Sequence, residues 1–356
     1  MKPLRVLISI LLSGALVGLD LMVAPTARAC ACGGFVATGG EQVAADAEYA
    51  VLSWDGTTEQ VILSMDTKTV SKDAALLIPT PAPAKAALDE PDVFTQLKKA
   101  TAPTVRIKRQ WWPEWGFGDG NAAGAPSSSG SHVDVLRTSR LGPLEVSVLA
   151  ADNADKLTAW LNAHHYVMRS SMAKALRPYV KQGWYYTAIR LVADEANLSG
   201  ALQPLALRFS SAEFVYPMRL SAAAPESQFV RTYVFADHQV KRTDETRTST
   251  PGPSLYFAGR LPPDAVTAES LVSIRQQHPY LTVIDQYFSN PEQQIVSDFT
   301  FARADQDHPY RQIDERTRMV SILGAPAGPM LIFFGVVVAA VVGVVVLLLR
   351  RHRRSV

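Results

Sequence analysis

An uncharged run of 20 residues near the C-terminus, 330–349, most constrains what this 356-residue chain can fold into. At a rise of 1.5 Å per residue, about 20 helical residues span the roughly 30 Å hydrocarbon core of a bilayer. A helix buried in a protein core is the alternative, but the length of the run and its lack of a polar face oppose that interpretation. We therefore predict a single transmembrane helix over 330–349.

Basic residues follow this run at once and indicate its orientation. The tail, 350–356, contains four arginines, Arg350, Arg351, Arg353 and Arg354. Arginines beside a membrane span are retained on the cytoplasmic side. The tail is too short for a domain, and its arginines are suited to anionic lipid head groups. The preceding 300 residues are then expected outside the cytoplasm.

The N-terminus, 1–29, has the pattern of a secretory signal peptide. Lys2 and Arg5 precede an apolar run, and Ala27-Arg28-Ala29 forms a small-x-small cleavage site. Asp20 interrupts the apolar run, which argues against the alternative of an uncleaved N-terminal anchor. Both ends of the chain thus predict a single-pass protein of the cell membrane. Its N-terminal domain is expected outside the cytoplasm, and its C-terminal tail inside.

The region between the two apolar segments is mildly acidic. Residues 30–329 contain 28 Lys and Arg against 32 Asp and Glu, a net charge of −4. The positive balance of the whole chain therefore belongs to its ends, and composition gives no case for a nucleic-acid partner. Three hundred residues suffice for one large domain or two smaller ones.

Apolar patterning in 30–329 predicts an α+β fold, with a mainly antiparallel β-sheet and a few segregated helices. The pair Asp55-Gly56 between two apolar runs predicts a β-hairpin. Further strands are expected at 74–79, 133–136, 144–149, 184–192, 205–209, 214–220, 228–235 and 294–301. Helices are expected just after 90, at 152–163, at 172–181 and near 268–277.

Two cysteines, Cys30 and Cys32, stand at the predicted start of the mature chain. With no others present, disulfides do not staple the core. A bridge between them would close a small and strained ring. The alternatives are a lipid-modified Cys30, a redox pair and part of a metal site. The residues before Cys30 match a lipoprotein signal poorly, the spacing is not Cys-x-x-Cys, and no further ligand lies at metal spacing. An anchored or bridged N-terminal hairpin remains the simplest interpretation.

A tryptophan cluster is the most distinctive local feature. Trp111, Trp112 and Trp115 are half of the chain's six tryptophans, and a Gly/Ser-rich stretch follows them. We expect a flexible loop at about 116–131. Exposed tryptophans bind sugar rings or lie at a membrane interface. The alternative is that they fold back over the edge of the core.

Several motifs together resemble a bacterial family, domain of unknown function 2330. They are Ala31-Cys32-Gly33-Gly34-Phe35, Trp54-Asp55-Gly56-Thr57-Thr58-Glu59, Leu77-Ile78-Pro79-Thr80-Pro81-Ala82-Pro83, Leu157-Thr158-Ala159-Trp160-Leu161, Gly183-Trp184-Tyr185 and Val215-Tyr216-Pro217-Met218-Arg219-Leu220. The resemblance covers most of 31–240. It implies a secreted or membrane-anchored bacterial protein and carries over no catalytic residue.

No catalytic signature, metal-binding pattern or cofactor motif stands out. His278-Pro279-Tyr280 and His308-Pro309-Tyr310 repeat a short pattern, which shared turn chemistry or chance explains. The other interpretation is a two-histidine site completed by Asp285 or Asp314, in a hydrolase or metal-dependent enzyme outside the cytoplasm. We favour a non-enzymatic binding or structural module of the bacterial cell envelope. Its expected partner is an envelope protein or cell-wall material, bound through the tryptophan cluster.

Overall fold

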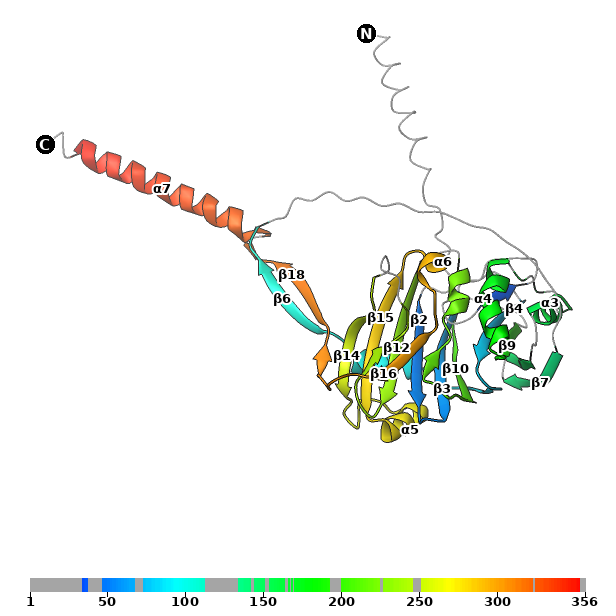
Figure 1. Ribbon diagram of the computed structural model, residues 1–356. Coiled ribbons are helices and arrows are strands. Elements are labelled where there is room, and N and C mark those ends of the chain that lie inside the picture. Colours follow the sequence, from blue (N-terminus) through cyan, green and yellow to red (C-terminus); the bar gives the residue numbers. More distant parts are fainter. Residues whose placement is uncertain are drawn as a thin grey trace, which may run out of the picture.

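The computed structural model describes residues 34–37, 47–67, 73–112, 134–141, 144–150, 154–163, 166, 168, 170–192, 200–224, 227–245, 251–322 and 324–352. The predicted signal peptide, Cys30, Cys32, Trp115 and the predicted loop at 116–131 lie outside these ranges. Within them the protein is rich in antiparallel strands with a few helices, as predicted (Figure 1). The fold class expected from the sequence is thereby confirmed.

An eight-stranded sheet forms the larger part of the folded body. Its order is β17 (Tyr310–Arg311), β14 (Ser254–Arg260), β15 (Tyr280–Phe288), β12 (Gln228–Ala236), β2 (Glu48–Trp54), β3 (Thr58–Thr67), β10 (Gly200–Ser210) and β5 (Lys85–Leu88). The neighbours pair antiparallel except β2 and β12, which run parallel. The expected hairpin joins β2 to β3, where Gly56 has a φ of +95°, a value that favours glycine.

A five-stranded antiparallel sheet forms the second part. Its order is β1 (Gly34–Ala37), β4 (Asp73–Thr80), β9 (Tyr185–Val192), β8 (Leu144–Ala150) and β7 (Asp134–Leu141). Helices α3 (Ala154–Ala163) and α4 (Ser170–Lys181) lie against it (Figure 1). Leu157, Trp160 and Leu161 of α3 are buried there, which is the face that the sequence pattern predicted.

Apolar residues of both sheets meet in one continuous core. This cluster combines Leu52 and Leu63 of the large sheet with Leu76 and Ile189 of the small one. A three-stranded sheet, β11 (Val215–Tyr216), β16 (Phe299–Arg303) and β13 (Val240–Arg242), packs against the same core. The two sheets are therefore joined by buried apolar contacts.

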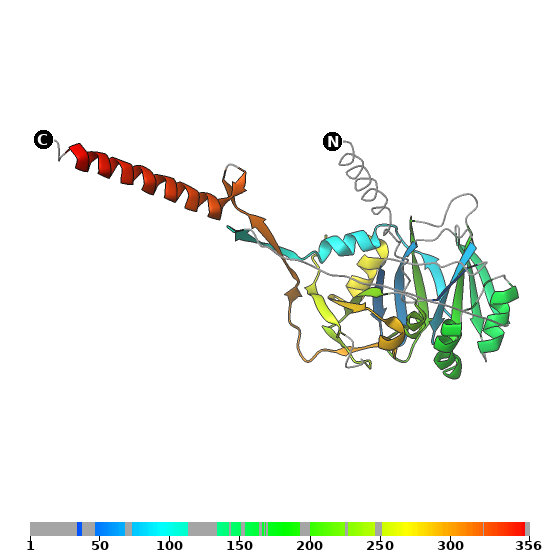
Figure 2. The same ribbon diagram turned by 90° about the horizontal axis from the view of Figure 1, so that it is seen from above.

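The other face of the large sheet is covered by helices α2 (Val93–Ala100) and α5 (Glu269–Gln277). In the view from above, the cyan α2 and the yellow α5 lie beside each other (Figure 2). Leu97 of α2 and Leu271 of α5 are fully buried in the same cluster. Both helices were expected from the sequence.

Two expected strands differ from the structure. Residues 214–220 form only the short β11, because Pro217 has no N–H for a continuing ladder, and the 3-10 helix η1 (Arg219–Ala223) follows. The segment 294–301 begins with the last residue of helix α6 (Pro291–Gln294), and β16 starts only at Phe299. Pro291 suits the first turn of a helix, where its missing N–H costs nothing.

A two-stranded parallel ribbon leads from the body to the C-terminal helix. Strands β6 (Thr104–Gln110) and β18 (Ile313–Met319) pair over their full length, and β19 (Ser321–Ile322) and β20 (Ala325–Pro326) follow. Helix α7 (Ala327–His352) then extends away from the body (Figures 1 and 2). It is long and apolar enough to cross a membrane, and its most apolar stretch is entirely unburied. A candidate membrane span thus stands where the sequence predicted one.

Candidate functional site

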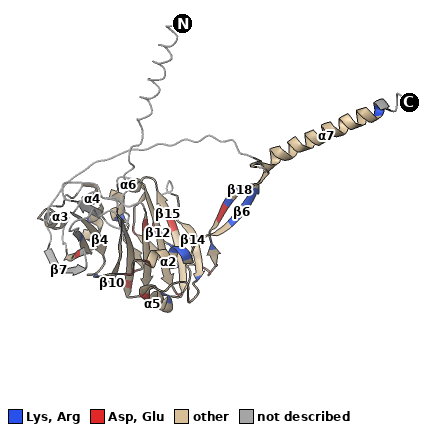
Figure 3. Ribbon diagram, turned by 180° about the vertical axis from the view of Figure 1, so that it is seen from behind, with Lys and Arg blue, Asp and Glu red and all other residues tan. Residues whose placement is uncertain are grey.

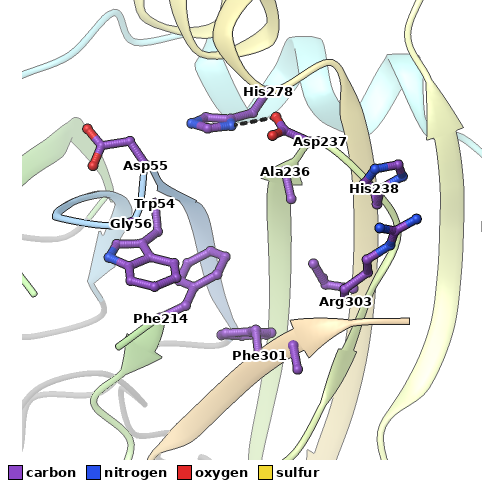
Figure 4. A pocket seen from close by; sticks show the side chains of 12 residues that line it. Trp54, Asp55, Gly56, Phe214, Ala236, Asp237, His238, His278, Phe301 and Arg303 are labelled. Atoms are coloured by element: carbon purple, nitrogen blue, oxygen red, sulfur yellow. Dashed lines mark hydrogen bonds and ion pairs between the residues drawn. The ribbon is translucent and has the colours of Figure 1, made fainter. Parts of the chain in front are cut away.

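An open cleft of about 340 Å³ lies at the turn of the β2–β3 hairpin (Figure 4). Its walls come from five separate parts of the chain: this hairpin, the segment before β11, the segment from the end of β12 to β13, the end of α5, and β16. The cleft is therefore created by tertiary packing.

Aromatic rings form the floor of the cleft. The rings of Trp54 and Phe214 stack with their centroids 6.0 Å apart, and Phe214 is 5.0 Å from Phe301. The indole Nε1 of Trp54 donates a hydrogen bond to the backbone oxygen of Ser211 over 3.0 Å, which fixes the ring. Val240 adds a buried aliphatic side chain to the same lining. This floor suits an apolar group of a ligand.

Charged and polar side chains surround that floor. His278 Nδ1 lies 3.1 Å from Asp237 Oδ1 (Figure 4), and His238 Nδ1 lies 3.0 Å from Asp307 Oδ2. Hydrogen bonding to His238 lowers the pKa of Asp307. Arg303 brings a guanidinium to the rim. The rim therefore has fixed polar partners for a ligand that enters the floor.

Asp55 completes the rim at the hairpin turn. Its Oδ1 accepts hydrogen bonds from the backbone N–H groups of Thr58 at 2.7 Å and Thr57 at 2.9 Å. These bonds, that of Thr58 foremost, lower the pKa of the Asp55 carboxyl, which stays ionised at neutral pH. The same residue thus shapes the turn and gives the rim a negative charge.

A buried carboxyl lies beside Trp54 in the hairpin. Glu59 is opposite Trp54 in the ladder and fully buried, and its Oε2 accepts a long 3.4 Å hydrogen bond from the N–H of Val215. Burial raises the pKa of Glu59 well above its ordinary value. The folded protein therefore keeps this proton at a pH where the unfolded chain has released it, so its stability falls as pH rises above about 4.5.

Replacing Glu59 tests this linkage. We expect Glu59→Gln to gain stability relative to the unsubstituted chain as the pH rises from about 5 to 8. The gain should approach about 1.4 kcal/mol per pH unit while the folded carboxyl stays protonated. Chemical unfolding of the full chain in detergent, repeated across this range, measures it. The exposed Glu213→Gln is the control, and a pH-independent difference for Glu59→Gln would contradict the buried, protonated carboxyl.

A second cavity, about 790 Å³, lies between α4 and the segment that contains β11 and η1. Asp298 lines it and is almost completely buried. Its Oδ1 accepts hydrogen bonds from the Tyr179 hydroxyl and from the N–H groups of Met218 at 2.8 Å and Arg219 at 3.1 Å. Arg219 Nε lies 3.2 Å from its other oxygen. Burial raises the pKa of Asp298 and, more strongly, that of Tyr179. This arrangement links helix α4 to the segments next to β11 and β16 of the three-stranded sheet.

Two of the three tryptophans singled out in the sequence are described, and both lie away from the cleft. Trp111 and Trp112 follow β6 at the foot of α7, and both are about half exposed. The N–H of Gly328 donates a 2.8 Å hydrogen bond to the Trp111 backbone oxygen. A Cβ at position 328 would come within 2.7 Å of that oxygen and of the Trp112 indole, so the close approach requires glycine. Their position is next to the candidate membrane span.

The proposed two-histidine site gains no support from the structure. The side chain of His278 pairs with Asp237, whereas His308 donates its backbone N–H to Gln239 over 2.8 Å. Asp285 accepts hydrogen bonds from the Nε and Nη2 of Arg231, each at 2.6 Å, and Asp314 pairs with Arg316 at 2.7 Å. Within the described ranges, no three His, Cys, Asp or Glu residues are grouped to hold a metal ion.

Most cleft residues escaped the sequence analysis, because they are distant along the chain. Trp54-Asp55-Gly56 had drawn attention as part of a hairpin and of a family motif, and His278 as part of a repeat. The two His–Asp pairs join segments 41 and 69 residues apart. No local pattern could have indicated those contacts.

The structure is that of a β-rich α+β protein whose C-terminal helix is a candidate membrane span. The chain belongs to the DUF2330 family, described as an uncharacterized protein conserved in bacteria, whose model matches residues 26–302. No curated protein matches it. Among solved structures, it is similar to the crystal structure of baculovirus P35, at 12% identity and a TM-score of 0.35, over 74% of this chain and 97% of that one.

Proposed function

We propose that this protein is a membrane-anchored binding module of the bacterial cell envelope, with its folded domain outside the cytoplasm. Helix α7 serves as the anchor, and the basic residues after 349 keep its far end in the cytoplasm. The family match supports a bacterial protein. The observation that carries the binding role is the open cleft with an aromatic floor and a charged rim.

The cleft favours a protein partner that inserts one apolar side chain. A volume of about 340 Å³ is at the lower end of small-ligand pockets, and it accommodates one large side chain. Interfaces between proteins derive most of their binding energy from such anchors in pockets. Asp55 and the 71%-exposed side chain of Asp237 would attract basic residues that flank the anchor in the partner.

Photocrosslinking in intact cells tests the cleft directly. We expect a photoreactive amino acid in place of Arg303, at the rim, to form a discrete protein adduct. Adding Ala302→Trp, which fills the cleft from an exposed position, should reduce that adduct at least about tenfold, because truncating or blocking an anchor costs 2 kcal/mol or more. The adduct is measured by immunoblotting and identified by mass spectrometry.

The same photoreactive residue in place of Tyr287 is the matched control, since Tyr287 is 50% exposed and outside the cleft. Equal adducts from both positions, or an adduct that Ala302→Trp leaves unchanged, would contradict binding at the cleft. An adduct that a muramidase digests would show a cell-wall glycan in place of a protein. The thermal unfolding of Ala302→Trp must match that of the unsubstituted chain.

A further inference from the structure

We propose that Arg109 and Arg318, on the β6–β18 ribbon, bind the phosphate groups of anionic phospholipids in the leaflet that faces the domain. This site is separate from the cleft. It rests on the membrane anchoring by α7 proposed above, but not on the binding of a protein partner.

The pairing of the ribbon brings these two arginines together. In the parallel register, Arg109 is opposite Arg318, so both side chains leave the same face of the ribbon. Like charges placed opposite each other destabilise a strand pair. Within the described residues, neither arginine takes part in an ion pair or a side-chain hydrogen bond. An anion between the two guanidinium groups would convert this repulsion into attraction.

On the other face of the ribbon, one carboxylate already pairs with both basic residues. Glu315 pairs there with Lys108 and, at 3.5 Å, with Arg106. Figure 3 shows blue along β6 and both colours along β18. The face of Arg109 and Arg318 also carries Asp314, which pairs with Arg316 at 2.7 Å. Among the described residues, Arg109 and Arg318 are therefore a pair of cations at the α7 end with no carboxylate paired to either.

The apolar residues on the face of Arg109 and Arg318 also suit a membrane surface. Val105 and Ile107 lie on the same face of β6 as Arg109, because every second side chain of a strand shares a face. Their side chains are 47% and 56% exposed. Exposed aliphatic groups beside cations are typical of segments that lie at the boundary between lipid head groups and water. The face thus combines both properties that an anionic membrane surface attracts.

The height of the arginines above the candidate span fits the layer of lipid phosphates. Trp111 is hydrogen bonded to Gly328, in the first turn of α7, and Arg109 precedes Trp111 by two residues, about 7 Å of strand. The head-group layer on each side of the hydrocarbon core is about 5–8 Å thick. Trp111 and Trp112 lie between Arg109 and α7 along this path, and tryptophan is enriched at membrane interfaces. Arginine binds phosphate through two parallel hydrogen bonds.

Two charge-matched double variants test the site in the full chain. The chain is inserted into nanodiscs of phosphatidylcholine with a minor fraction of phosphatidylglycerol, and native mass spectrometry counts the phosphatidylglycerol retained when the discs are disrupted. We expect Arg109→Gln with Arg318→Gln to lower this retention by roughly tenfold or more, given the attraction of each basic residue to anionic lipid. Arg106→Gln with Lys108→Gln removes the same charge from the opposite face and should leave retention nearly unchanged.

The outcomes separate this site from the proposed anchor. Equal retention by the two double variants would overturn the lipid site while leaving the anchor intact. Failure of the unsubstituted chain to enter nanodiscs would overturn both. Displacement of the retained lipid by millimolar inorganic phosphate would show a site for free phosphate, which also overturns the proposal.

Discussion

Replacing Asp298 with alanine is expected to lower the free energy of unfolding by about 3–5 kcal/mol, as breaking a buried ion pair from one side does. The carboxylate of Asp298 accepts three hydrogen bonds and pairs with Arg219, so its loss leaves several buried donors without a partner. Tyr179 belongs to α4, which lies against the five-stranded sheet, whereas Met218 and Arg219 adjoin β11 of the three-stranded sheet. The variant therefore weakens the connection between these two sheets. Chemical unfolding in detergent measures the loss.

Asp305→Ala provides the matched control. Asp305 also pairs with a basic residue, Lys241, at 2.7 Å, but its side chain is 89% exposed. Exposed ion pairs contribute little to stability. Near-wild-type unfolding of Asp305→Ala, with a large loss for Asp298→Ala, is the expected pattern. Similar unfolding of both variants would contradict the structural role assigned to Asp298.

The second large effect concerns helix α7. Replacing Val338 and Val341 together by aspartate places two charges near the middle of the candidate span, where both side chains are exposed in the structure. Each aspartate at the centre of a membrane helix costs about 2.5–3.5 kcal/mol on insertion scales. We expect the protein to leave the membrane fraction after a carbonate wash, as fractionation and immunoblotting of cells would show.

Val338→Leu with Val341→Leu retains an apolar helix and should fractionate like the unsubstituted chain. Continued membrane retention of the double aspartate variant, after residues 1–29 have been removed, would contradict anchoring by α7. N-terminal sequencing of the purified protein establishes whether that segment is present. The measurement therefore distinguishes α7 from an uncleaved signal sequence as the anchor.

The sequence was most informative where structure is encoded locally. Asp55-Gly56 predicted a hairpin because few residue pairs adopt such a turn. The helix expected at 172–181 ends at Lys181, shortly before Gly183, which has a φ of +70°. Strand β15 was missed although its residues are almost continuously buried. The preceding His-Pro-Tyr motif had been considered only as a repeat.

Long-range pairing was beyond the reach of patterns. Strands β6 and β18 have charged residues on both faces and no buried side, so no alternation marks them as strands. Their partnership joins residues about 200 positions apart. The cleft depends on the same kind of information, since Trp54, Phe214 and Phe301 come from three distant segments. Residue types can indicate the chemistry of each, but only the fold brings them together.

The ribbon also has a consequence for the order of assembly. One of its strands comes before most of the folded body in the chain, and the other comes after it, immediately before α7. Closing so long a loop is entropically costly unless the intervening residues are already compact. The ribbon is therefore expected to close late, once both sheets have formed. The body would then acquire its fixed distance from the candidate span as one of the last events of folding.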